Sequence, residues 1–108
     1  MNFLIVTDEY DKDMGILRKE LSVDIGAFKM RASRHSTIFE NNVLRITLIP
    51  VYNITDNWLR GRKVNGIQID CPVNEELYHK LQCCVWRNGI SVKYPVMTEI
   101  KIEENSQE

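Results

Sequence analysis

The chain has 108 residues, 44% hydrophobic and 27% charged, which is the composition of an ordinary soluble globular domain. This length supports one core and excludes enzymes built from several domains. No apolar run reaches the roughly 18 residues of a membrane-spanning helix, so we expect a cytoplasmic protein without a membrane partner. The three cysteines, two of them adjacent, do not form a disulfide framework and fit a reducing compartment.

The formal net charge of -1 conceals an uneven distribution of charge. Residues 28–63 carry seven Lys and Arg side chains against two acidic ones, and the rest of the chain carries seven against 13. The middle of the chain is therefore basic and the remainder acidic. A local basic segment can meet phosphates or an acidic partner although the whole protein is near neutral.

The first elements in chain order are a strand and a helix. Residues 3–6 are apolar and partly β-branched, which is typical of a buried strand. Thr7 or Asp8 is expected to cap the helix that follows. The helix extends to Leu21 because its apolar residues repeat at helical spacing. These residues are Tyr10, Met14, Leu17 and Leu21.

Three strands are expected next, at residues 28–32, 36–40 and 43–52. The third is apolar on both faces, which indicates a largely buried strand with Pro50 near its end. Residues 53–63 form a polar connection that contains Trp58.

The second half begins with a strand at residues 64–70, which Pro72 terminates. Asn74 is expected to cap a second helix that ends at Asn88 and Gly89, with an apolar stripe of Leu77, Leu81, Cys84 and Val85. A strand at 90–94 and an alternating segment at 96–102 follow, and the acidic tail 103–108 is expected to be frayed.

This order of elements predicts a single α/β (or α+β) domain over residues 1–102. Two helix-linked crossings favour a mixed, mostly parallel sheet of about five strands with two main helices.

A resemblance to a known family lies between residues 41 and 71. The apolar strand 43–52, the element Leu59-Arg60-Gly61 and the strand Ile67-Gln68-Ile69-Asp70 together resemble the Walker B half of phage packaging ATPases (large terminase subunits) and related P-loop proteins. The resemblance implies that Asp70 coordinates magnesium through water and that a glutamate follows it to position the attacking water. Cys71 stands there instead.

The sequence also lacks a loop that cradles phosphates. Gly61 and Gly66 have the nearest spacing, but Ile67 and Gln68 stand where lysine and Ser/Thr are needed. We therefore expect no ATP hydrolysis, no catalytic residues and no cofactor.

Metal binding has weak support in the sequence. Asp70 is a weak candidate ligand because hard cations usually need several oxygen ligands. The spacing of Cys71, His79, Cys83 and Cys84 is not that of a tetrahedral zinc site.

The basic segment is the candidate binding surface. Arginines beside an aromatic ring suit an acidic protein surface, and they also suit phosphate contacts with base stacking. A pI near 6.1 favours a protein partner over nucleic acid. The alternative is that the basic segment binds no partner and forms a solvated surface whose charge is balanced by the acidic segments. The candidate binding residues are Lys29, Arg31, Arg34, Trp58, Arg60, Arg62 and Lys63.

The leading hypothesis is a small, non-catalytic phage-type protein that binds another macromolecule. Its sharpest form is an anti-CRISPR-like inhibitor whose partner is a host defence nuclease complex. One alternative is an accessory P-loop or terminase-like subunit that needs a partner chain to bind ATP. Another is a nucleic-acid-binding module that uses the basic segment 29–63. A homodimer also remains open.

Overall fold

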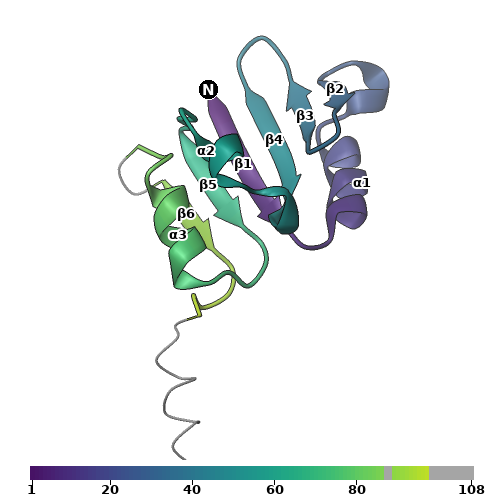
Figure 1. The fold of residues 1–108 in the computed structure, drawn as a ribbon. Helices are drawn as coiled ribbons and strands as arrows, with labels where there is room; N and C mark the ends of the chain where they lie inside the picture. Colours follow the sequence, from purple (N-terminus) through teal and green to yellow (C-terminus); the bar gives the residue numbers. More distant parts are fainter. Residues whose placement is uncertain (87–88, 98–108) are drawn as a thin grey trace, which may run out of the picture.

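In the computed structural model, which describes residues 1–86 and 89–97, six strands form one sheet (Figure 1). The strands are β1 (Asn2–Thr7), β2 (Lys29–Ala32), β3 (Thr37–Glu40), β4 (Arg45–Pro50), β5 (Gly66–Ile69) and β6 (Ile90–Val92). The α-helices are α1 (Tyr10–Glu20), α2 (Asp56–Leu59) and α3 (Glu75–Gln82), and the 3-10 turns are η1 (Val23–Ile25) and η2 (Val51–Asn53).

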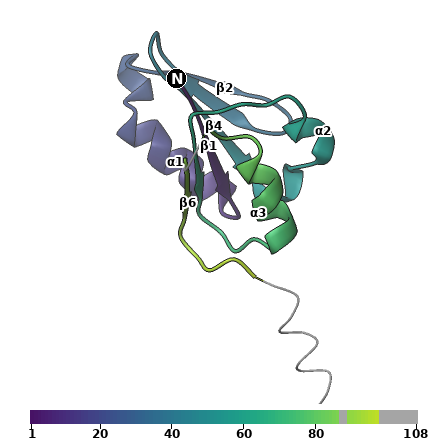
Figure 2. The same ribbon diagram turned by 90° about the vertical axis from the view of Figure 1, so that its left-hand side faces the viewer.

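The strand order in the sheet is β2-β3-β4-β1-β5-β6. β4, β1, β5 and β6 are parallel, whereas β2, β3 and β4 pair in antiparallel fashion. α1 lies on one face of the sheet, and α2 and α3 lie on the other (Figure 2). The predicted α/β class with a mixed, mostly parallel sheet and two main helices is confirmed, and the sheet has six strands rather than about five.

The main core lies between the sheet and the helices α2 and α3. Leu4 and Val6 of β1 alternate onto this face beside buried residues of β4 and β5, as the two-residue period of a strand requires. Leu81 of α3 is fully buried against them. The stripe predicted for the second helix therefore packs in the main core, which contains Leu77, Leu81, Cys84 and Val85.

A smaller core lies under α1, over β3 and β4. Phe39 and Leu48 are fully buried there, and the hydroxyl of Tyr10 hydrogen-bonds that of Thr37. The apolar stripe of α1 is only half-buried, and no residue of this helix is fully buried.

The predicted cap of α1 is wrong. Glu9 occupies the N-cap position and makes no side-chain capping bond. The hydroxyl of Thr7 instead accepts the Glu9 N–H at 2.9 Å and donates to the Asp13 carboxylate at 2.5 Å. Thr7 to Glu9 therefore form a local turn closed by the Thr7 side chain, and this turn lies before the first hydrogen-bonded turn of the helix.

Two further predictions about helices need correction. The connection 53–63 contains α2, whose first turn is capped by the Thr55 hydroxyl accepting the Trp58 N–H at 3.1 Å. The second helix is capped by Asn74, as predicted, but it ends at Gln82 rather than near residue 88. Asn88 lies outside the described residues.

Five of the strands are shorter than predicted, whereas the first, expected at residues 3–6, is longer and covers Asn2–Thr7. The strand expected at 43–52 covers Arg45–Pro50 and gives way to η2, the strand at 64–70 covers Gly66–Ile69, and the strand at 90–94 covers Ile90–Val92. Of the segment 96–102, Met97 makes a parallel bridge with Asn74, and residues 98–102 lie outside the described part of the chain together with the tail 103–108. Within the described residues, none of the helices has the length and hydropathy needed to cross a membrane.

Candidate functional site

The fold separates the seven candidate binding residues into two groups. Lys29, Arg31 and Arg34 lie on or next to β2, at one edge of the sheet. The other four lie in α2 and in the loop that leads to β5. Three strands stand between β2 and β5, and at about 4.8 Å per strand this places them about 19 Å apart. The basic middle of the sequence therefore contributes to two separate surfaces of the folded protein.

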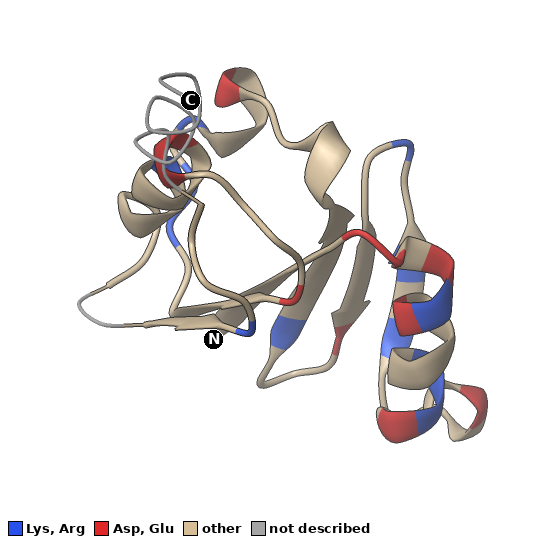
Figure 3. Cartoon of the chain, turned by 90° about the horizontal axis from the view of Figure 1, so that it is seen from below, with Lys and Arg blue, Asp and Glu red and all other residues tan. Residues whose placement is uncertain are grey.

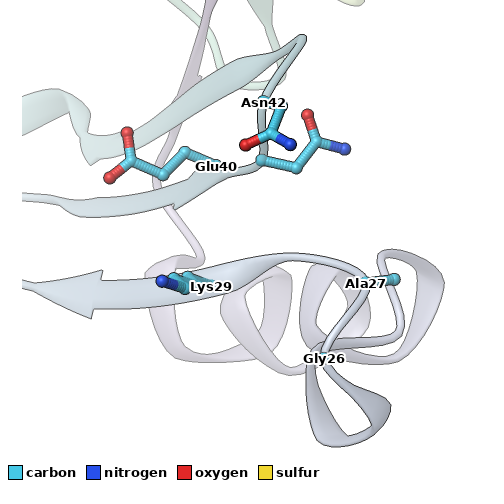
Figure 4. A pocket seen from close by; sticks show the side chains of 6 residues that line it. Gly26, Ala27, Lys29, Glu40 and Asn42 are labelled. Carbon is cyan, nitrogen blue, oxygen red and sulfur yellow. The ribbon is translucent and has the colours of Figure 1, made fainter.

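One carboxylate, that of Glu40, lies beside the strand that carries Lys29 and Arg31. Glu40 lies opposite Lys29 in the register of β2 and β3, and its oxygens are 3.6 Å from the Arg31 guanidinium and 2.9 Å from that of Arg45. A hollow of about 340 Å³ beside Lys29 and Glu40 is completed by Asn41, Asn42 and the backbone at residues 26–27 (Figure 4). Its lining carries one exposed cation, Lys29, and one half-buried anion, Glu40, so the hollow favours neither sign of ligand strongly.

The second group begins with the turn after α2. Gly61 has a φ of +73°, a left-handed conformation in which a side chain would be strained. This turn follows α2 directly, and the N–H of Arg62 bonds back to the carbonyl of Leu59 at 3.0 Å. Arg60 and Arg62 are thus held on either side of a tight, fixed turn.

Arg62 is fixed against Trp58. Its guanidinium carbon lies 3.6 Å from the centre of the indole ring, and its Nε donates to the Trp58 carbonyl at 2.8 Å. Trp58 also packs against the main core. Burial lowers the pKa of Arg62, yet the guanidinium keeps its charge, because arginine is not deprotonated in proteins. Its terminal nitrogens make no hydrogen bond to the described residues.

Two lysines complete this surface. The Lys63 ammonium donates to the carbonyl of Cys83 at 2.6 Å, at the C-terminal end of α3, where a cation is favoured. The Lys80 ammonium lies 2.9 Å from Asp56 and 3.1 Å from Glu76, and hydrogen bonds to these carboxylates raise its pKa. Sequence reasoning missed Lys80, for which the available signal was its i,i+4 pair with Glu76.

These four cations line one hollow of about 390 Å³, which we call the basic hollow. It is defined by Arg60, Arg62, Lys63 and Lys80, with Asp56 as the carboxylate in its lining. Arg60 is exposed and its side chain makes no ion pair or hydrogen bond with the described residues. Guanidinium groups with unused N–H donors bind carboxylates and phosphates in a bidentate way. The hollow is therefore suited to an anionic group.

The carboxyl end of the parallel strands is acidic by contrast. Asp8, Glu9, Asp11 and Asp13 lie at the junction of β1 and α1, where parallel α/β folds commonly bind phosphates. Asp70 follows β5, and both its oxygens accept hydrogen bonds from the Gln68 amide at 2.9 and 2.8 Å. A phosphate at this end of the sheet would meet several carboxylates.

The residue after Asp70 is buried. Burial, together with the nearby carboxylates of Asp8, Asp70 and Asp13, raises the pKa of the Cys71 thiol to about 11. Burial also raises the pKa of Cys84, whereas Cys83 is exposed. In the described part of the chain, no group of three or more His, Cys, Asp or Glu side chains is placed to hold a metal ion.

We predict that iodoacetamide at pH 8 modifies Cys83 in the folded protein and leaves Cys71 and Cys84 unmodified. With a pKa of about 11, only about one Cys71 thiol in a thousand is ionised at this pH, and the thiolate is the nucleophile. Peptide mapping by mass spectrometry measures each site, Cys83→Ser is the control, and all three should react in denaturant. Modification of Cys71 as fast as Cys83 would contradict the burial described here.

Comparison with known proteins gives one distant likeness. No family model and no curated protein matches this chain. Two solved structures of the large terminase from a thermophilic bacteriophage are similar to it. The complex with ADP is 12% identical over 98% of this chain and 29% of the terminase chain, with a TM-score of 0.46. The other crystal form is 11% identical over 98% and 30%, with a TM-score of 0.48. The chain thus spans less than a third of that terminase, and the similarity is distant.

Proposed function

We propose that this chain is a non-catalytic binding module that docks an acidic protein segment in the basic hollow. The observation that carries the proposal is the convergence of four cations from α2, the following loop and α3 on one hollow. Within the part of the chain that the structure describes, the Arg60 side chain and the terminal nitrogens of Arg62 make no hydrogen bond. A carboxylate of a partner can take bidentate hydrogen bonds from either group.

The state of Trp58 favours protein over nucleic acid as the partner. A base stacks on an exposed aromatic face. In Trp58 the Arg62 guanidinium covers one face of the ring, and the side chain packs against the main core. The formal net charge of -1 also provides little long-range attraction for a nucleic acid. The alternative is that the basic segment 29–63 binds nucleic acid, and the experiment below distinguishes this alternative from binding of an acidic protein segment.

The proposal is tested with three fluorescently labelled probes: a poly-glutamate peptide, a poly-lysine peptide and a single-stranded oligonucleotide. The poly-glutamate peptide should bind best, and Arg60→Glu should weaken its binding about tenfold, because hydrogen bonds to charged groups are worth about 1.5–3 kcal/mol. Fluorescence anisotropy at low and moderate salt measures the affinities, which should fall as salt rises.

The matched control is Lys19→Glu, which makes the same change of charge on exposed α1. It should leave the binding of poly-glutamate unchanged. Equal losses in Arg60→Glu and Lys19→Glu, or tighter binding of the oligonucleotide than of the peptide, would overturn the proposal.

The absence of ATPase activity is the second part of the proposal. We expect the chain alone to bind no Mg-ATP, because the β1–α1 junction presents Asp8, Glu9, Asp11 and Asp13 to a triphosphate. Isothermal titration of Mg-ATP should give only heats of dilution, and phosphate release should equal that of buffer. A saturable one-to-one isotherm would contradict this expectation and favour an ATP-binding subunit.

The narrower form of the proposal is an anti-CRISPR-like inhibitor, in which a host defence nuclease complex supplies the acidic segment. It rests on the basic hollow and the resemblance of residues 59–70 to phage proteins. Added to a purified CRISPR nuclease, the wild-type chain should slow cleavage of target DNA, and Arg60→Glu should slow it less. Unchanged cleavage would rule out the anti-CRISPR-like role, and the broader binding proposal would still be tested by the peptide assay.

A further inference from the structure

Among the described residues, α1 covers only part of the sheet face on which it packs. α1 packs over β3 and β4, where Phe39 and Leu48 are fully buried. On the same face, β1 contributes Phe3 and Ile5, and β4 contributes Ile46 beside Phe3. These three side chains are only half-buried. In the described part of the chain, apolar side chains in the middle of the six-stranded sheet thus stay partly exposed beside α1.

Two hollows meet on this open half. The first, of about 330 Å³, is mainly apolar and lies over β1, with lining residues that include Phe3, Ile5 and Ile46. The second, of about 230 Å³, lies between β1 and α1. Ile5 and Gln68 line both hollows, so they form one continuous groove. We call it the β1 groove.

The floor of the β1 groove includes a position without a side chain. Gly66 of β5 lies beside Phe3 in the sheet, and a Cβ added to Gly66 would come within 2.8 Å of the Phe3 ring. The ring therefore lies directly against the backbone of β5, and a side chain at residue 66 would collide with it. Gly89 and Ser91 continue the lining of the groove toward β6.

The charges along the β1 groove have one sign. Asp13 and Glu20 of α1 and Asp70 after β5 line the second hollow, where Ile16 and Leu17 supply apolar contacts. No Lys or Arg of the described residues lines either hollow. The groove therefore offers an apolar floor with acidic groups along the wall made by α1 and the end of β5.

We propose that the β1 groove binds a basic amphipathic helix of a partner protein. An α/β sheet that is apolar on both faces is covered by helices on both. A helix beside α1 would complete the layer that α1 begins, with its apolar side on Phe3, Ile5 and Ile46 and its basic side chains toward Asp13, Glu20 and Asp70. The six residues of β1 extend over about 20 Å, the length of about 13 helical residues.

This inference goes beyond the proposed function. The β1 groove lies on the α1 face of the sheet, whereas the basic hollow is built by α2, the following loop and α3 on the opposite face (Figure 2). The charges that line the two surfaces also differ in sign, because the β1 groove is lined by acidic side chains and the basic hollow mainly by cations. Figure 3 shows that α1 as a whole carries both basic and acidic residues. A substitution that abolishes binding at one surface should therefore leave binding at the other surface intact.

The probe is a helical peptide of leucine and lysine, about 14 residues long, with leucines at helical spacing. The matched peptide carries glutamate in place of lysine. The lysine peptide should bind the wild-type chain and gain helical circular dichroism. Gln68→Trp, which places a large side chain at an exposed position of the groove, and Glu20→Lys should each weaken its binding at least about tenfold.

Two control variants locate the effect. Asp11→Lys makes the same change of charge as Glu20→Lys on an exposed position of α1 that lines neither hollow, and it should bind the lysine peptide like the wild type. Arg60→Glu, which disables the basic hollow, should also bind this peptide normally. Equal losses in Asp11→Lys and Glu20→Lys, or unchanged binding in Gln68→Trp, would overturn the inference.

Mapping on the wild-type chain keeps the test independent of how the variants fold. In methyl NMR spectra, the lysine peptide should shift the resonances of Ile5, Ile16 and Ile46, which line the groove. It should leave the resonance of Ile25 unchanged, because this side chain is 85% exposed and lies in η1. Shifts confined to residues outside the groove, or equal shifts with the glutamate peptide, would contradict the inference.

Discussion

The burial of β1 between two parallel neighbours is the constraint on which the other features of the fold depend. β1 pairs with β4 on one side and with β5 on the other. Because side chains alternate along a strand, Leu4 and Val6 supply one face of the sheet while Phe3 and Ile5 supply the other. Both faces therefore need a cover. α2 and α3 cover one face of β1, and α1 is displaced toward β3 and β4 on the other.

The opposite charges of the two surfaces follow from the same topology. The chain after β1 forms α1, whose first turn is acidic, on one face of the sheet. The chain after β4 forms α2 and the arginine-containing loop on the other face (Figure 2). Charges in solution are screened over about 8–10 Å at physiological ionic strength. The basic hollow and the β1 groove can therefore act as separate electrostatic surfaces, although their charges nearly cancel in the net charge of -1.

Much of this fold could be predicted from local sequence patterns, and the failures have physical causes. The cap at Asn74 and the position of Pro50 near the end of a strand are effects of single residues on their own backbone, so both could be predicted from the sequence. α2 has only four residues, which is too short for a helical period to show. The second helix ends early because Val85 leaves it to bridge Val64 of a distant loop, a tertiary contact.

The candidate site was harder to predict because its residues meet only through strand order. Proximity along the chain suggested one surface from Lys29 to Lys63, yet the hairpin of β2 and β3 carries Lys29 and Arg31 to the far edge of the sheet. Lys80 reaches the hollow from α3, about 20 residues away in sequence from Arg60. The half-open sheet face depends on where α1 packs, which periodicity does not specify.

The bonds that hold Arg62 and Lys63 to backbone carbonyls have a consequence for the thermodynamics of association. Ordering a long, flexible side chain at an interface costs about 0.5–1.5 kcal/mol. The stacking of Arg62 on Trp58 and the bond from Lys63 to Cys83 restrict both side chains in the unbound protein. Much of this entropy is therefore lost during folding, and a docking carboxylate would find two of the four cations already rigid.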